Sequence, residues 1–365
     1  MSRSKAVSNP ELEAAILQDP DAVDAYLVYG DWLQSHGDPR GELISLHHAW
    51  ARAHGLEAKS FEQQAHEFLQ RHEPRLVGDV LAQALRNKHL ELDWDLGFIR
   101  AARVCPDSPA EEETARRIVR ELIRHPSARF LRALSVGGIA TFGFIDRYDG
   151  ITRLIVRAGG SRTLQTLALR ARRHNGADDY PSIQIGDVAP LYAVLPRLRS
   201  LDLRGAHARL GDIDLPELRE FTLETHNLSR PCLDSILSAK WPKLEQLTVW
   251  LGGTNTGAEW SVEDIHPLLD GDGLPNLRGL GLCGTRFTDT LVHALHDSRV
   301  LPRLTHLDLS GGTLSNQGAQ WLSEHAEAFQ HLQHLDLRGN MMTDVGMARV
   351  AALCLSVDAQ EQHNR

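Results

Sequence analysis

The stretches LPRLTHLDLS at residues 301–310 and HLQHLDLRGN at residues 331–340 carry one pattern, leucine-x-x-leucine-x-leucine. The pattern occurs eight times, with valine or phenylalanine replacing one leucine in three copies. The copies begin at Leu131, Leu164, Leu198, Leu218, Leu244, Leu277, Leu304 and Leu332. The intervals between them are 33, 34, 20, 26, 33, 27 and 28 residues. Self-similarity at such a period is typical of an array in which each repeat packs on its neighbours.

Within each copy, the last two apolar positions alternate with other residues at the period of a β-strand. The apolar side chains are therefore predicted to point into a core, and the residues between them onto the open face of a sheet. Intervals of 26 to 28 residues leave room for a strand and a helix. The unit from Leu198 to Leu218 is shorter, so we expect it to cross with a turn. The pattern predicts a curved α/β solenoid with a parallel concave sheet and a mostly helical convex side.

Residues before the first copy show helical spacing of apolar side chains. Gly37 suits a left-handed helix end, Asp38 an N-cap and Pro39 the first turn of the next helix. Two further helices are predicted near 60–71 and 74–87. We therefore predict that residues 1–88 form an all-α module that caps the solenoid, because an open solenoid end would expose core leucines.

The segments AAILQDPD (14–21), LVYGDWL (27–33) and HGDPRGELI (36–44) resemble the bacterial repeat-companion domain. Gly30 stands where that family more often has alanine. The family is a short helical module found before leucine-rich repeats and has no established activity. The resemblance therefore implies an architecture, and implies that residues 97–104 form the first, degenerate strand of the array.

The last repeats resemble leucine-rich repeats of the ribonuclease-inhibitor type. Asn340 occupies the asparagine position of that pattern, where its amide is expected to bond backbone groups of adjacent turns. The resemblance implies protein binding, without implying ribonuclease as the target. The predicted domains are the module at 1–88, the solenoid at 89–355 and a flexible C-terminal tail at 356–365.

Composition narrows the class of partner. The formal net charge is −9, and a mildly acidic chain is poorly suited to non-specific binding of nucleic acid. The four cysteines form no C-x-x-C pair, and the first ten residues contain no apolar signal segment. No apolar run reaches the roughly 18 residues of a transmembrane helix. We expect a cytoplasmic monomer that binds no membrane and no nucleic acid.

The residues between the inward leucines form the candidate site, a concave face that binds a partner protein. Exposed tryptophan and arginine often anchor interfaces. The candidate partner-binding residues are Arg170, Asp202, Arg204, Glu220, Glu224, Trp250, His306, Asp308, His334, Asp336 and Arg338. The sequence predicts a non-catalytic interaction scaffold. The alternative is a regulator or substrate receptor that works with a separate kinase, ligase or toxin.

Catalytic chemistry has weaker support. His306, Asp308, His334 and Asp336 fall on adjacent predicted strands and are residue types that bind zinc. Because neighbouring repeats share the same sequence pattern, these paired histidines and aspartates are explained by the repeat itself. We therefore predict no metal site, no cofactor and no catalytic residue. The basic run Arg170–His174 is interpreted as a solvated loop flank rather than a contact for RNA or an acidic partner, and the glycine-rich stretch 251–257 as an inter-repeat insertion or a binding loop.

Overall fold

The computed structural model describes residues 7–105, 112–137, 148–170, 184–225, 228–252 and 260–363. They form two compact units. The N-terminal unit holds residues 7–105, 112–137 and 150–168, and the C-terminal unit holds the remaining described residues. No helix among the described residues combines the length and apolar character needed to cross a bilayer.

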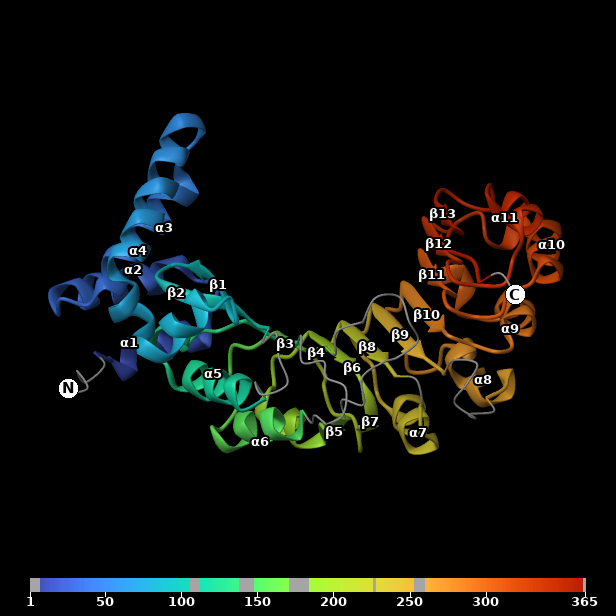
Figure 1. Cartoon of the computed structure of the whole chain (residues 1–365), viewed down its shortest axis with the longest axis horizontal. Helices are drawn as coiled ribbons and strands as arrows, with labels where there is room; N and C mark the ends of the chain where they lie inside the picture. Colours follow the sequence, from blue (N-terminus) through green and yellow to red (C-terminus); the bar gives the residue numbers. More distant parts are fainter. Residues whose placement is uncertain are drawn as a thin grey trace. The chain divides into compact units, whose positions relative to one another are not determined.

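The N-terminal unit combines a helical module with the first strands of the array. Its elements are α1 (Pro10–Gln18), α2 (Val23–Ser35), α3 (Pro39–Arg52), α4 (Gly55–Arg86), β1 (Leu90–Asp95), β2 (Phe98–Val104), α5 (Glu112–Arg124), β3 (Ala133–Gly137), α6 (Asp149–Arg157) and β4 (Thr166–Arg170), which runs on into the C-terminal unit. Helices α1 to α4 gather beside the β1–β2 pair (Figure 1).

Local sequence signals set the helix ends. Gly37 has φ 67°, and the Asp38 side chain accepts from the Arg40 N–H at the start of α3. Both were predicted. The two helices expected near 60–71 and 74–87 are present as two helical segments of α4, which meet at a kink at Gly78, with φ 70°, several residues later than predicted.

Residues 90–104 form two strands, whereas one was predicted. β1 and β2 pair antiparallel, and β2 then pairs parallel with β3. The turn between β1 and β2 places Leu96 at φ 44° and Gly97 at φ 74°. Phe98 at the start of β2 packs in an aromatic core with Tyr26, Tyr29 and Phe130, all fully buried.

That core joins the helical module to the repeats. Tyr26 and Tyr29 belong to α2, while Phe98 and Phe130 belong to the array. The change from helices to strands falls near residue 88, but the compact units divide near Ala168. The module and the first repeats therefore share one hydrophobic core.

The C-terminal unit continues the array with one strand for each turn. Its further elements are β5 (Gln184–Asp187), β6 (Ser200–Arg204), β7 (Ala206–Arg209), β8 (Glu220–Glu224), α7 (Arg230–Ser238), β9 (Gln246–Trp250), α8 (Val262–Asp270), β10 (Gly279–Cys283), α9 (Thr288–His296), β11 (His306–Asp308), α10 (Asn316–Glu324), β12 (His334–Asp336), α11 (Asp344–Val350) and β13 (Val357–Asp358). The strand order is β6-β8-β9-β10-β11-β12-β13, with helices α7 to α11 on the outer side (Figure 1).

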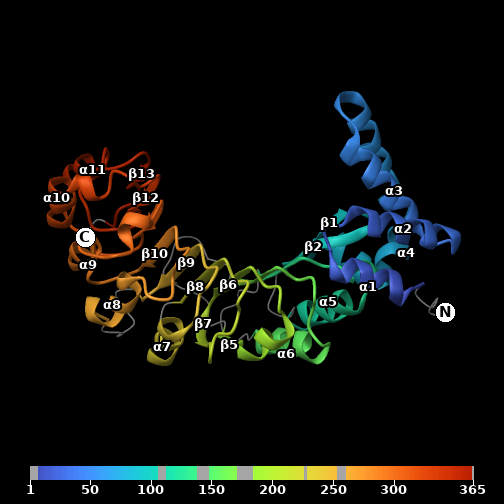
Figure 2. The ribbon, with the colours of Figure 1, turned by 180° about the vertical axis from the view of Figure 1, so that it is seen from behind.

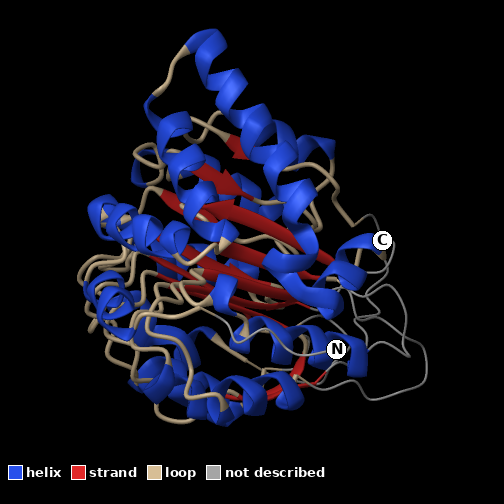
Figure 3. Cartoon of the chain, turned by 90° about the vertical axis from the view of Figure 1, so that its left-hand side faces the viewer, coloured by secondary structure: helices blue, strands red, loops and turns tan. Residues whose placement is uncertain are grey.

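The strands pair in parallel with one register throughout this unit. Leu201 pairs with Phe221, and Phe221 with Leu247. The same interior column continues through Leu280, Leu307 and Leu335 to Val357. Figure 3 shows the strands as consecutive rungs. The predicted alignment of interior leucines is present.

The convex side is not helical everywhere. The short unit between β6 and β8 crosses through β7, which pairs parallel with β5 in a separate two-stranded sheet. This agrees with the expectation that the 198–218 unit lacks a helix.

Part of the segment 356–365, predicted to be a flexible tail, contacts the last repeat. β13 pairs with β12, and Gln362 Nε2 donates to the carbonyl oxygens of Leu337 and Ala359, each at 2.9 Å. The polar composition of the segment suggested fraying, but its residues form hydrogen bonds with the backbone groups at the edge of the last repeat.

Candidate functional site

The concave face of the C-terminal unit consists of three columns of side chains in strict register. The first runs through Ser200, Glu220, Gln246, Gly279, His306 and His334. The second runs through Asp202, Thr222, Thr248, Gly281, Asp308, Asp336 and Asp358. The third holds the residues that end the strands, from Arg204 and Glu224 to Trp250 and Cys283.

Exposure divides the predicted binding residues into three groups. Arg170, Glu220, His306 and Arg338 are exposed. A second group is half-buried, comprising Asp202, Arg204, Trp250, Asp308 and His334. Glu224 and Asp336, at 2% and 4% exposure, are buried, which corrects the expectation that they face a partner.

Ion pairs explain the two buried carboxylates, across paired strands for Glu224 and within one strand segment for Asp336. Glu224 Oε2 lies 2.5 Å from Arg204 Nε, and the Asp336 carboxylate receives Arg338 Nε at 3.0 Å. Asp202 likewise accepts from Arg170 Nε at 2.7 Å. A buried carboxylate requires such a partner, because removing a lone charge from water is costly. Strand-to-strand pairing was not readable from the alternating pattern alone.

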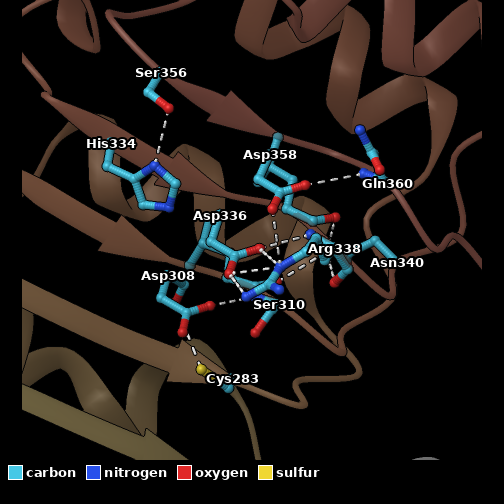
Figure 4. A network of polar contacts seen from close by, with 12 residues as sticks. Cys283, Asp308, Ser310, His334, Asp336, Arg338, Asn340, Ser356, Asp358 and Gln360 are labelled. Carbon is cyan, nitrogen blue, oxygen red and sulfur yellow. Dashed lines mark hydrogen bonds and ion pairs between the residues drawn. The ribbon is translucent and has the colours of Figure 1, made fainter. Parts of the chain in front are cut away.

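Arg338 is the centre of the polar network in Figure 4. It binds Asp336 and also lies 3.3 Å from Asp358 Oδ2. The hydrogen bonds and the negative charge of Asp336, followed by the charge of Asp358, raise the pKa of the Arg338 guanidinium. Sequence reasoning missed Asp358 because it placed that residue in a flexible tail. The aspartate pattern of the two preceding strands was the available signal.

Trp250 lies over two glycines rather than standing free on the rim. A Cβ added at Gly284 would be 3.1 Å from Trp250 Cε3, and one at Gly311 would be 2.9 Å from Cη2. Both glycines have positive φ, 66° and 68°, so the backbone also favours glycine there. The six-membered ring of the indole thus lies close to the backbone of the next two turns, with part of the side chain exposed. Residues 253–257 of the adjoining glycine-rich stretch lie outside the described residues.

Strand β10 presents little side chain to the concave face. Its Gly279 and Gly281 are covered by Gln246 and Thr248 of β9, whose atoms would collide with any added Cβ. Cys283 at the end of β10 is fully buried, and burial raises the pKa of its thiol well above the ordinary value. A thiol in this state is a poor nucleophile.

The histidines and aspartates of β11 and β12 are adjacent but engaged separately. The His306 and His334 ring centroids are 6.3 Å apart, and Asp308 Oδ1 accepts from the Ser310 N–H at 2.9 Å. Asp336 is held by Arg338. Across the described ranges, no three His, Cys, Asp or Glu side chains are grouped to hold a metal ion. The basic run predicted after β4 lies outside the described residues from 171 onward.

Comparisons with known proteins agree with this geometry. A leucine-rich-repeat family model matches residues 301–323 and 330–351. No curated protein sequence shows a significant match to the chain. A crystal structure of a Bacteroides fragilis protein, a structural genomics target, superposes with a TM-score of 0.63 at 20% identity, covering 82% of this chain and 85% of that chain. At this identity the likeness concerns the fold alone.

An internalin from Listeria monocytogenes is also similar, with a TM-score of 0.30 at 13% identity over 66% of this chain and 77% of that chain. That superposition is too loose to carry an argument. The family match places leucine-rich repeats at residues 301–323 and 330–351.

Proposed function

We propose that the protein is a non-catalytic interaction scaffold that binds a partner protein through the concave face of its C-terminal unit. Leucine-rich repeats generally serve protein interaction, and stacked repeats present one extended concave surface. The partner is proposed to meet the exposed residues Glu220, His306 and Arg338 and the exposed part of Trp250. The predicted cytoplasmic location and monomeric state stay part of this proposal.

The observation that carries the proposal is the shared register from β6 to β12. It fixes the outward side chains as columns on a single sheet face, so a partner meets them at constant spacing. The indole of Trp250 is already held in place by Gly284 and Gly311, so binding would cost little of its conformational entropy.

The test begins with capture of a partner from the native host by the full chain, followed by calorimetry with the identified protein. The variant Glu220→Lys/His306→Glu changes two exposed concave side chains on β8 and β11. It is expected to weaken binding at least tenfold, because it inverts the charge at position 220 and introduces a carboxylate at position 306 on the surface where the partner is proposed to dock.

The matched control is Glu327→Lys/His266→Glu, which makes the same substitutions at exposed positions on the helical side. It should bind like the unchanged protein. Equal weakening in both variants, or in neither, would contradict concave binding. Glu224 and Asp336 are unsuitable targets, because their loss would leave Arg204 or Arg338 without its main partner.

The alternative, a regulator or substrate receptor for a separate enzyme, uses the same surface and differs in the identity of the captured protein. We do not propose a metal-dependent enzyme, because Asp308 and Asp336 are engaged by Ser310 and Arg338.

A further inference from the structure

The outer faces of α5 and α6, in the N-terminal unit, carry rows of arginine. On α5, Arg117, Arg120 and Arg124 are exposed and spaced by three and four residues, which places them on one stripe. Buried Ile118, Val119 and Leu122 occupy the opposite side. The arginine stripe therefore points directly away from the core.

Helix α6 repeats the arrangement in the next turn. Arg153 and Arg157 are exposed four residues apart, and Arg162 is exposed in the segment that follows. The two helices are neighbours in both views of the unit (Figures 1 and 2). A Cβ added at Gly150 of α6 would lie 2.3 Å from Arg116 Nε of α5. The two helices therefore pack against each other, and we call the six exposed arginines that they and the following segment carry the arginine surface.

Glu113 and Glu121 lie on the same helix as the α5 stripe, but only one of the six arginines forms an ion pair with a described residue. Arg120 lies 3.7 Å from Glu113, which is itself 68% exposed, so the pair is weak. The other five arginines form no ion pair with a described residue. By contrast, Arg230 of α7 forms ion pairs with Asp234 and Asp264. The arginine surface is a local feature of α5 and α6 in a chain of net charge −9.

We propose that this surface, defined by Arg117, Arg120, Arg124, Arg153, Arg157 and Arg162, docks an acidic segment of a partner protein. Guanidinium groups bind carboxylates in a bidentate manner, and the α5 stripe extends over roughly 10 Å, the length of a short peptide segment. A nucleic acid fits less well, because its charge continues beyond the surface and would meet the acidic remainder of the chain. This site is separate from the concave face, so either proposal can fail alone.

The test measures fluorescence anisotropy of a labelled oligoglutamate peptide titrated with the full chain. The variant Arg117→Gln/Arg120→Gln/Arg124→Gln should weaken binding tenfold or more, and added salt should weaken binding to the unchanged protein. The control Arg209→Gln/Arg286→Gln/Arg299→Gln removes the same charge from exposed positions of the C-terminal unit and should bind normally. Circular dichroism melting confirms that both variants are folded.

Equal affinity of the stripe variant and the unchanged protein would overturn the proposal. So would a single-stranded RNA of equal charge that competes with the peptide and binds the stripe more tightly. Equal losses of affinity in the stripe variant and the control would show that net charge alone accounts for peptide binding, and would also overturn the proposal.

Discussion

His125 lies at the junction between α5 and the following strand, half-buried against the break in α4. Its Nδ1 accepts from the Ser127 N–H at 3.2 Å, and Ser127 Oγ donates to the Leu76 carbonyl at 2.6 Å. Burial, helped by the positive charge of Arg40, lowers the pKa of His125 to about 4. The folded protein therefore holds this imidazole neutral where an unfolded chain would bind a proton.

The depressed pKa makes stability depend on pH in one direction. Between the unfolded pKa of about 6.5 and the folded value the unfolded chain binds more protons, so stability falls as the pH drops through this range. The loss reaches up to about 3 kcal/mol once the pH is near the folded pKa. In His125→Asn, the amide oxygen replaces Nδ1 as acceptor and does not titrate.

Urea unfolding of both proteins at neutral pH and near pH 4.5 checks this. Lowering the pH should reduce the free energy of unfolding of the unchanged protein by about 2 kcal/mol more than that of His125→Asn. A difference that is the same at both pH values would show that another group titrates.

Asn340 shows how far a single residue can be predicted. Its Nδ2 donates to the carbonyls of Leu309 and Leu337 at 2.9 Å, and its Oδ1 accepts from the Leu314 N–H, as the repeat pattern implies. The preceding turn has Gly312 at the equivalent position, and there the Thr313 N–H donates instead to Thr288 Oγ1 of the turn before it, at 2.9 Å. A threonine at the start of a helix also suits the N-cap position, but Thr288 is the first residue of α9 and Phe287 stands at the N-cap. Backbone geometry, which the residue type does not encode, decides between these roles.

At the scale of elements, strands with the full leucine pattern were predictable, and those without it were not. β1 has a single buried residue, Leu90, and ends in a turn with Leu96 in left-handed conformation. Leucine is rarely found there, so nothing in the sequence indicates a hairpin. β13 is two residues long and is fixed by pairing with β12 rather than by its own composition.

Because β13 and the residues after it complete the last repeat, their removal should loosen that repeat. Deleting residues 356–365 takes away the carbonyls that accept from the Leu335 and Leu337 N–H groups at 2.9 and 2.7 Å. Hydrogen exchange should then speed up by tenfold or more in β12 and α11, with little change in β6 and β8. The control is the substitution Glu361→Gln in the intact chain, at an exposed position of the same segment. Unchanged protection of β12 after deletion would mean that the tail is dispensable.

At the scale of the molecule, the direction of the concave side chains followed from the leucine pattern, but their availability did not. Facing the same way placed Glu220 and Glu224 in one set, yet only Glu220 is exposed, because Arg204 covers Glu224. The pairing of residues from distant repeats depends on register, which appears only when the strands are stacked.

The same reasoning applies to the helical module, whose polar contacts with the first repeats span long stretches of sequence. Glu13, 6% exposed, forms an ion pair with Arg129 and accepts from the Tyr29 hydroxyl at 2.6 Å. Arg132 Nη1 lies 2.6 Å from Asp21 Oδ1. Each contact joins α1 or the segment after it to the array.

A chain that begins at residue 89 should therefore fail to fold its first repeats, rather than lose an independent domain. It would expose Phe98 and Phe130, at a cost of about 3 kcal/mol or more for each ring, and would leave Arg129 without Glu13. We expect faster hydrogen exchange throughout β2 and β3 and a stronger tendency to aggregate than the full chain shows. The variant Ser60→Ala, on an exposed part of α4, is the control for changes within the module. Native-like protection of β2 and β3 in the shortened chain would mean that the module only covers the array and does not share its core.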